Sequence, residues 1–105
     1  MNNKFKKEHF GILRKISKNS EISQRDLAND LELSLGKINY CLGELKNKGL
    51  IKIKNFKKHK NKAQYLYLLT PKGIAEKTDL TVKFMKLKMK EYDELKNDLE
   101  NQKNN

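Results

Sequence analysis

The spacing of apolar residues changes at Gly49, and this change limits the folds open to the chain. Before Gly49, apolar side chains recur every three or four positions, which is the spacing of amphipathic helices. After it, Leu50–Phe56 and Gln64–Leu69 alternate loosely, which predicts two strands of a β-hairpin with Lys57–Ala63 at its tip. The chain is therefore predicted to be mainly α with a small β-hairpin, in the α+β class.

Two short helices joined by a tight turn are predicted before the hairpin. Ser23 and Ser34 are suited to be N-caps, because a serine hydroxyl can accept hydrogen bonds from free amides of the first helical turn. Gly49 is suited to follow the last of these helices, since glycine readily adopts a left-handed backbone. The predicted helices run from about Lys4 to Lys18, from Gln24 to about Leu31, and from just after Ser34 to near Lys48. The last two form a helix-turn-helix, and the hairpin forms its wing.

A long final helix is predicted after the hairpin. Thr70 is a suitable N-cap, and Pro71 fits the first helical position, where a missing N–H costs nothing. The helical pattern runs to about Glu100, a break or bend at Thr78–Thr81 stays open, and Asn101–Asn105 is expected to be a frayed tail. The chain thus divides into a winged helix-turn-helix domain, residues 1–75, and a C-terminal helix with its tail, residues 76–105.

This last helix is longer than so small a domain can cover. About 30 helical residues extend roughly 45 Å, so the apolar stripe is expected to outrun the core beyond Lys86. The alternative is a helix packed only on its own domain. We expect a homodimer, in which the stripe pairs with a second copy through Leu80, Phe84, Leu87, Tyr92, Leu95 and Leu99.

The positive charge is concentrated in one part of the chain. The formal net charge is +11, and the segment from Leu45 to Ala75 contains nine lysines and no acidic residue. Such a local excess indicates an anionic partner, with nucleic acid ranked before a membrane surface. No stretch approaches the roughly 20 apolar residues of a membrane span, and no secretory signal is evident, so a cytoplasmic location is expected.

No catalytic, cofactor or metal site is evident, so we expect no enzyme activity. The sequence contains no nucleophile elbow, phosphate-binding loop or paired-carboxylate pattern. Cys41 is the single cysteine and is interpreted as a buried apolar residue. His9 is expected on a helix face and His59 in the wing, and two histidines so far apart are weak evidence for a metal.

Two segments resemble the MarR family of transcriptional regulators. Ser34–Ile51 resembles its recognition-helix signature, and Leu69-Thr70-Pro71-Lys72-Gly73 resembles its strand-to-helix junction. The chain looks closest to the short branch associated with exopolysaccharide (EPS) biosynthesis. The resemblance implies a winged helix that binds DNA. It also departs from the family, because the usual wing arginine is missing and lysines stand there instead.

The residues expected to contact DNA fall into two groups. Base reading is assigned to the start of the third helix, where asparagine is a usual partner of adenine: Ser34, Leu35, Gly36, Lys37, Asn39 and Tyr40. Phosphate binding is assigned to the start of the second helix and to the wing, because lysine is a point charge suited to phosphate: Ser23, Gln24, Arg25, Lys54, Lys57, Lys58, His59, Lys60 and Lys62.

The predicted function is that of a sequence-specific transcriptional regulator, with a repressor favoured over an activator. It is expected to bind double-stranded DNA as a homodimer on a palindromic operator. Two alternatives stay open. One is a winged-helix module whose third helix contacts protein, and the other is a nucleic-acid-binding protein without sequence preference. No cofactor, membrane partner or small-molecule effector is expected.

Overall fold

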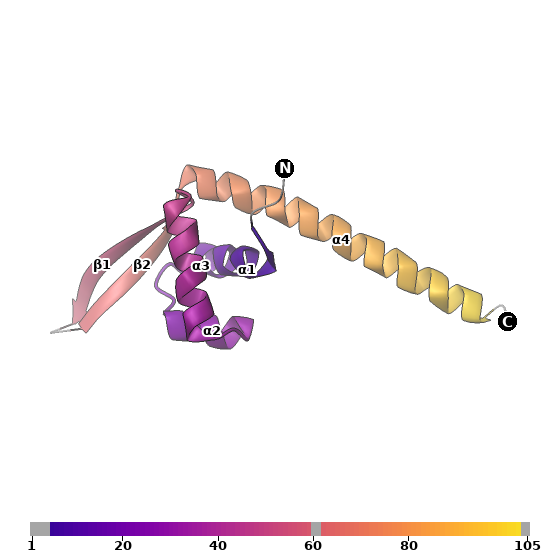
Figure 1. Ribbon diagram of the computed structural model, residues 1–105, viewed down its shortest axis with the longest axis horizontal. Helices are drawn as coiled ribbons and strands as arrows, with labels where there is room; N and C mark the ends of the chain where they lie inside the picture. The colour runs from indigo at the N-terminus through magenta and orange to yellow at the C-terminus, as the bar shows by residue number, and fades with distance from the viewer. Residues whose placement is uncertain (1–4, 60–61, 104–105) are drawn as a thin grey trace.

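The computed structural model of the chain describes residues 5–59 and 62–103, with the side chains of residues 56–63 left out. Three short helices pack together, a two-stranded hairpin projects from them, and a long helix leaves on the opposite side (Figure 1). The elements are α1 (Lys7–Lys18), α2 (Gln24–Leu31), α3 (Leu35–Asn47), β1 (Ile51–His59), β2 (Lys62–Leu69) and α4 (Pro71–Lys103). This arrangement confirms the winged helix-turn-helix fold.

The predicted caps of the helix-turn-helix are confirmed. The Ser23 hydroxyl accepts a hydrogen bond from the Asp26 amide at 3.0 Å, and the Ser34 hydroxyl accepts one from the Lys37 amide at 3.0 Å. Glu32 joins α2 to α3 with a left-handed backbone, at φ 55°. The turn is therefore made by a residue that pays a conformational penalty of roughly 1 kcal/mol, a feature that its sequence does not suggest.

The predicted end of α3 at Gly49 is also confirmed. Gly49 has a φ of +76°, and its amide donates to the Lys46 carbonyl at 2.9 Å. The next amide, of Leu50, donates to the Leu45 carbonyl at 2.9 Å, which completes a Schellman motif. The chain thus leaves α3 in a defined direction and enters β1 two residues later.

One apolar core lies between the three short helices, the base of the hairpin and the start of α4. Each helix contributes the apolar face that its periodicity predicts, and Cys41 is fully buried within it, as expected. The buried apolar residues are Ile12, Leu13, Ile16, Ile22, Leu27, Ile38, Cys41, Leu42, Leu45, Leu50, Ile51, Tyr67 and Leu80.

The hairpin is longer than predicted. Antiparallel pairing runs from Ile51↔Leu69 to His59↔Lys62, with an irregularity between Lys57 and His59. Lys57–Ala63 was expected to form the tip, but most of these residues belong to the strands, and residues 60–61 lie outside the described part. Backbone hydrogen bonds alone are sufficient to pair two antiparallel strands, so the pairing can continue into a segment that has no apolar alternation. The base of β2 is also joined to the chain before α2, where the Tyr67 amide donates to the Ser20 carbonyl at 2.9 Å.

The two helix boundaries predicted near the termini need correction. Helix α1 begins at Lys7 instead of Lys4, after an extended N-cap at Lys6. Helix α4 continues to Lys103, beyond the expected end at Glu100, so most of the expected tail is helical. Two pairs of opposite charge four residues apart, Lys90–Glu94 and Lys96–Glu100, can support the helix in this part.

Helix α4 is continuous through Thr78–Thr81, where a break was left open. The hydroxyls of Thr78 and Thr81 donate to the carbonyls of Ile74 and Lys77 at 3.1 and 2.7 Å, which keeps them within the helix. The predicted start is confirmed, because the Thr70 hydroxyl accepts a hydrogen bond from the Gly73 amide at 3.0 Å. Among the described residues, no helix is long and apolar enough to cross a membrane.

Replacing Gly73 with alanine is expected to destabilise the protein by about 3 kcal/mol or more. A Cβ atom there would overlap the Leu50 carbonyl oxygen, and a backbone atom cannot move aside as a side chain can. Gly43→Ala is the matched control in α3, because its Cβ would meet no atom within 4 Å and the change should stabilise the helix by roughly 0.5–1 kcal/mol. Urea unfolding measures both. Equal effects of the two substitutions would contradict the packing argument.

Candidate nucleic-acid interface

Helix α3 has one buried face and one open face. Ile38, Leu42 and Leu45 are buried against the other helices. On the other side, Gly36, Asn39 and Tyr40 are exposed, and Tyr40 keeps 62% of its surface accessible. The structure therefore places three of the predicted base-reading residues on an accessible surface of the predicted recognition helix.

Asn39 is tied to α2 and to the hairpin by a short chain of side chains. Its amide nitrogen Nδ2 lies 3.4 Å from Gln24 Oε1, and Gln24 Nε2 lies 3.3 Å from the Tyr67 hydroxyl. Tyr67 is buried in the core, so the chain of contacts starts at an immobile group. The contacts are long, but they engage the amide nitrogen of Asn39, and the residue as a whole is exposed.

Lys37 lies on the side of α3 that faces α1. Its Nζ atom is 3.9 Å from Glu8 Oε2 and 5.9 Å from the centre of the Tyr40 ring. Partly exposed ion pairs of this kind are worth no more than about 1 kcal/mol, so the lysine is free to exchange partners. A contact between Lys37 and a DNA base would require it to leave Glu8.

The first turns of α2 and α3 carry the remaining predicted contacts of the helix-turn-helix. The hydroxyls of Ser23 and Ser34 are used as caps, which leaves Arg25 at the start of α2 as an exposed cation. Leu35 is 50% exposed in the first turn of α3. The two helix starts together offer exposed amide groups, a cation and one apolar side chain.

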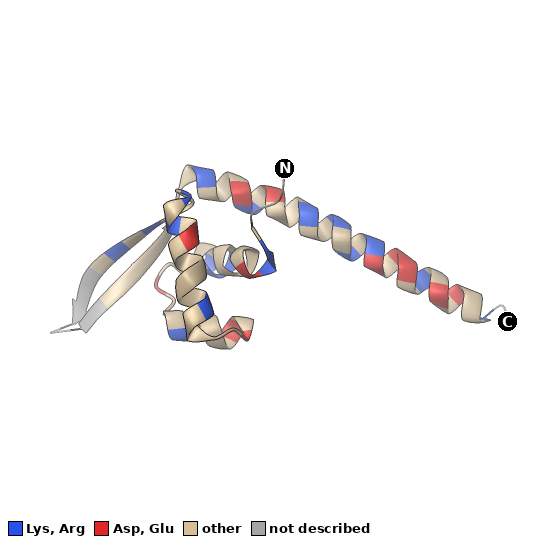
Figure 2. Cartoon of the chain, viewed as in Figure 1, with Lys and Arg blue, Asp and Glu red and all other residues tan. Residues whose placement is uncertain are grey.

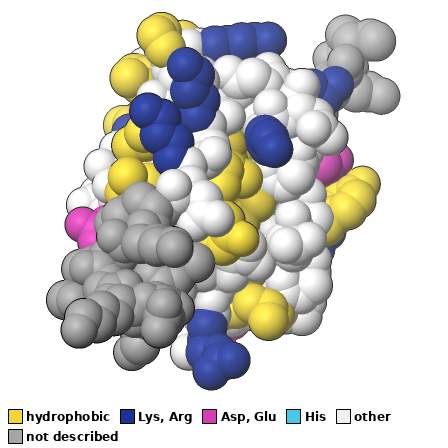
Figure 3. Space-filling model, turned by 90° about the vertical axis from the view of Figure 1, so that its left-hand side faces the viewer, with side chains coloured by type: hydrophobic (Ala, Val, Ile, Leu, Met, Phe, Trp, Pro, Cys, Tyr) yellow, Lys and Arg dark blue, Asp and Glu magenta, His cyan; other side chains and the backbone are white. Residues whose placement is uncertain are grey.

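The wing contributes positive charge. Lys52 and Lys54 are exposed on β1, and Lys54 pairs with Leu66 across the hairpin. Lys57, Lys58 and His59 lie in β1 and Lys62 in β2, but their side chains are outside the described set, as is all of Lys60. Figure 2 marks Lys and Arg positions in blue on β1 and on the helices beside the hairpin base. Figure 3 shows basic side chains over the end of the molecule from which the hairpin projects. Acidic side chains appear only toward the edges of that view (Figure 3).

The predicted dimerisation residues fall into two sets. Leu80 is buried in the core of its own chain, and Phe84 stacks on Phe10 with ring centres 5.0 Å apart. The other four, Leu87, Tyr92, Leu95 and Leu99, are between 46% and 67% exposed. Every described residue from Met85 to Lys103 is exposed, so this part of α4 lies outside the core of its own chain.

An open groove of about 780 Å³ lies where α4 passes α1 and α2. Its walls are mainly apolar and include three cationic residues, Lys7, Arg14 and Lys88. The full lining is Lys7, Glu8, Phe10, Gly11, Arg14, Leu31, Leu33, Thr81, Phe84, Met85, Lys88 and Met89. Met85 and Met89 are exposed and connect the groove with the apolar stripe of α4.

Two features of this surface were missed from the sequence. Tyr67 was assigned only to a strand, although its hydroxyl contacts Gln24. Glu44 was not assigned a role, although it receives a hydrogen bond from His9 at 2.8 Å. Strand alternation predicts that Tyr67 faces inward, but it does not identify Gln24, 43 residues away, as the partner of its hydroxyl.

Residues 9–52 match the protein-family model described as winged helix-turn-helix DNA-binding. They run from α1 through the helix-turn-helix into β1. The chain is a winged helix-turn-helix protein with the fold of MarR-family transcriptional regulators. That fold is shared with many solved structures, whereas no curated protein matches the chain in sequence.

Three solved structures illustrate the likeness. The PcaV transcriptional regulator from Streptomyces coelicolor, in complex with its natural ligand, has a TM-score of 0.73 at 16% identity, over 83% of this chain and 60% of PcaV. A MarR family transcription regulator has a TM-score of 0.66 at 25% identity, over 82% of this chain and 56% of its own. ZitR from Lactococcus lactis, a zinc-responsive MarR family member, has a TM-score of 0.69 at 22% identity, over 90% of this chain and 63% of ZitR. The chain therefore spans less than two thirds of each of these proteins.

Proposed function

We propose that this chain is a sequence-specific transcriptional repressor that binds a palindromic operator in double-stranded DNA as a homodimer. The observation that carries the proposal is the open face of α3, where Asn39 and Tyr40 are exposed beside the start of α2. An α-helix fits the major groove of B-DNA, and a polar face supplies the groups that distinguish base pairs there. Because the shared fold is that of transcription regulators, we infer regulation instead of catalysis.

Base reading is assigned mainly to Asn39. Its contact with Gln24 uses one amide hydrogen, so the carbonyl oxygen and the second hydrogen are free for the N6 and N7 atoms of adenine. Tyr40 can place its ring against a thymine methyl group or its hydroxyl on a phosphate. Gly36 and Gly43 carry no side chain, which allows the helix backbone to come close to the groove.

Phosphate contacts are assigned to the lysine-rich segment from Leu45 to Ala75, together with Arg25. The segment contains nine lysines and no acidic residue. A lysine is a point charge on a flexible stem, so we infer that this wing holds the DNA backbone and does not read the minor groove. Binding should therefore depend strongly on salt concentration.

The homodimer is assigned to the outer part of α4. Leu87, Tyr92, Leu95 and Leu99 are exposed on a segment that lies outside the core of its own chain. An isolated helix of this length is marginal in water, so a stable partner is needed to cover the stripe. A second copy of α4 would bring two α3 helices to half-sites about one turn of DNA apart.

Selection of bound duplexes from a random pool is the direct test of this function. The proposal predicts an enriched palindrome that is bound at least about 10³-fold more tightly than random duplex. No binding would favour a protein-interaction module, and binding without enrichment would favour a non-specific nucleic-acid-binding protein. Either of these outcomes contradicts the proposal.

Asn39→Ala is expected to weaken binding to the selected site by about 1–3 kcal/mol and to leave binding to random duplex unchanged. The matched control is Asn47→Ala, an exposed asparagine at the other end of the same helix. Fluorescence anisotropy with both duplexes measures the effect. Equal losses on both duplexes would mean that Asn39 contacts the backbone and reads no base.

Replacing Lys57, Lys58, Lys60 and Lys62 together with alanine is expected to weaken binding to every duplex. If all four contact phosphates, the slope of log K against log salt should fall by about 3–4. The control removes the same charge from exposed lysines of α4 outside that segment, with Lys86, Lys90, Lys96 and Lys103 changed to alanine. A slope that stays the same in the wing variant would remove the wing from the interface.

Truncation after Lys86 is expected to give a folded monomer, because the core residues Leu80 and Phe84 are kept while the exposed stripe is lost. Leu95→Lys in the full chain should also weaken the dimer, whereas Asn97→Lys, two positions away on α4, should not. Sedimentation equilibrium measures the dimer fraction. A truncated chain that still dimerises would place the interface elsewhere.

A further inference from the structure

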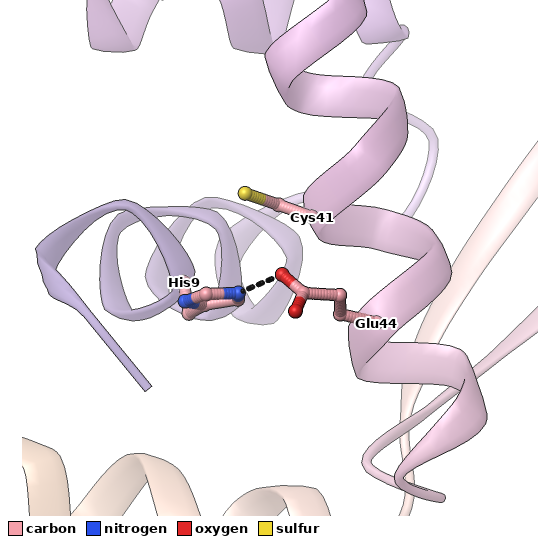
Figure 4. Close-up of side chains that lie close together, drawn as sticks. All are labelled: His9, Cys41 and Glu44. Carbon is pink, nitrogen blue, oxygen red and sulfur yellow. Dashed lines mark hydrogen bonds and ion pairs between the residues drawn. The ribbon is translucent and has the colours of Figure 1, made fainter. Parts of the chain in front are cut away.

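His9, Cys41 and Glu44 bring a nitrogen, a sulfur and an oxygen ligand together between α1 and α3 (Figure 4). The three ligand atoms lie within 4.8 Å of one another. His9 is 4% exposed and Cys41 is fully buried, while the Glu44 side chain is 38% exposed. We propose that these three residues form a binding site for a borderline-soft divalent cation, of which Zn²⁺ is the biological example.

The chemistry of the ligands selects the class of cation. A thiolate and an imidazole are poor ligands for Mg²⁺ and Ca²⁺, which prefer oxygen, whereas Zn²⁺ binds sulfur, nitrogen and oxygen. In a tetrahedral site with bonds of about 2.0–2.3 Å, ligand atoms are roughly 3.3–3.8 Å apart. His9 Nε2 and Glu44 Oε1 are 2.8 Å apart and need to separate by about 0.5 Å, which the partly exposed side chain of Glu44 can supply. The longest pair of ligand atoms, within 4.8 Å, needs to shorten by no more than about 1.5 Å. Because the Glu44 side of the site is partly exposed, water can occupy the fourth coordination position of the ion.

The charges around the site are nearly balanced before an ion binds. The positive charges of Lys37 and Lys6 lower the pKa of the Cys41 thiol, and the negative charges of Glu44 and Glu8 raise it. Burial raises the pKa of the Cys41 thiol, so without a cation the sulfur keeps its proton. A dication that takes the Cys41 thiolate and the Glu44 carboxylate is neutralised by them, and the thiol proton passes to solvent.

The histidine ring must change its tautomer when the ion binds. The Lys6 amide donates to His9 Nδ1 at 3.0 Å, so the ring proton is on Nε2, where it is directed to Glu44 at 2.8 Å. This hydrogen bond is the first cause of the lowered pKa of the Glu44 carboxyl group. A cation at Nε2 moves the ring proton to Nδ1 and releases the Lys6 amide to water at the exposed start of α1. One proton, that of Cys41, is therefore released for each ion bound.

The site joins the helix that precedes the helix-turn-helix to the helix assigned to base reading. Cys41 and Glu44 are in α3 and His9 is in α1, so a bound ion ties α3 to its support. This inference does not depend on DNA binding. It departs from the sequence prediction of no metal site, which rested on the separation of the two histidines from each other.

Titration of the full, reduced chain with Co²⁺ tests the site, because Co²⁺ replaces Zn²⁺ and gives a thiolate-to-cobalt charge-transfer band. Cys41 is the single cysteine, so the band reports on this sulfur alone. The expected result is saturation at one ion per chain, loss of the band when Zn²⁺ is added, and a Zn²⁺-dependent rise in Tm of about 10 °C at a hundredfold excess over Kd. The Lys6 amide resonance should shift at the same time.

Variants separate a three-ligand site from binding to the thiol alone. Cys41→Ala should abolish the band, and Glu44→Gln or His9→Gln should weaken Co²⁺ binding at least about tenfold. His59→Gln is the control, because it removes the other histidine. If His9→Gln does not fold, Glu44→Gln serves as the test of the three-ligand site, because the Glu44 side chain is partly exposed and its replacement should leave the fold intact. No band with the wild-type chain at millimolar Co²⁺, or unchanged affinity in Glu44→Gln, would overturn the proposal.

Discussion

The backbone carbonyl of Leu50 fixes how α3, the β1–β2 hairpin and α4 are arranged relative to one another. Its oxygen accepts a hydrogen bond from the Thr70 amide at 3.0 Å. The Thr70 hydroxyl lies between the carbonyl oxygens of Gly49 and Leu50, at 2.6 and 3.1 Å. Gly73 packs directly against the Leu50 carbonyl, in a space that no larger residue can occupy. Because Leu50 follows the end of α3 and Thr70 begins α4, the directions of both helices are set at one point. The hairpin starts and ends there as well, since Ile51 pairs with Leu69.

The parts of the fold that were predictable from the sequence depend on local interactions. Ser23, Ser34 and Thr70 cap helices through atoms only three residues away, and Gly49 ends α3 through its own backbone conformation. The apolar periods before and after Gly49 likewise report on single elements. The exposed positions of Asn39 and Tyr40 follow from the same periodicity, because Ile38 and Leu42 occupy the buried face. Side-chain burial in one helix is thus enough to locate its open face.

The parts that were not predictable depend on partners distant in the sequence. His9 is buried because Glu44, 35 residues away, accepts its hydrogen bond, and no spacing rule identifies that pair. Phe84 belongs to an apolar stripe that looks uniform in sequence, yet Phe10 covers it while Leu95 is left open. The length of the hairpin was underestimated for a related reason. The segment Lys57–Lys62 has no alternation of apolar and polar residues, so its composition gives no sign of where pairing ends.

The continuity of α4 has a consequence for how a dimer of this chain would read DNA. The helix runs unbroken from the Leu50 junction to Lys103, so it has no hinge between the core and the proposed dimer contact. The distance between two α3 helices then depends on the angle at which two copies of α4 cross. A change of crossing angle beyond Met85 moves the two reading helices apart or together, because each domain is fixed to its own α4. In the dimer proposed above, Asn39 and Tyr40 would select the bases of each half-site, whereas the apolar stripe of α4 would select the spacing between half-sites.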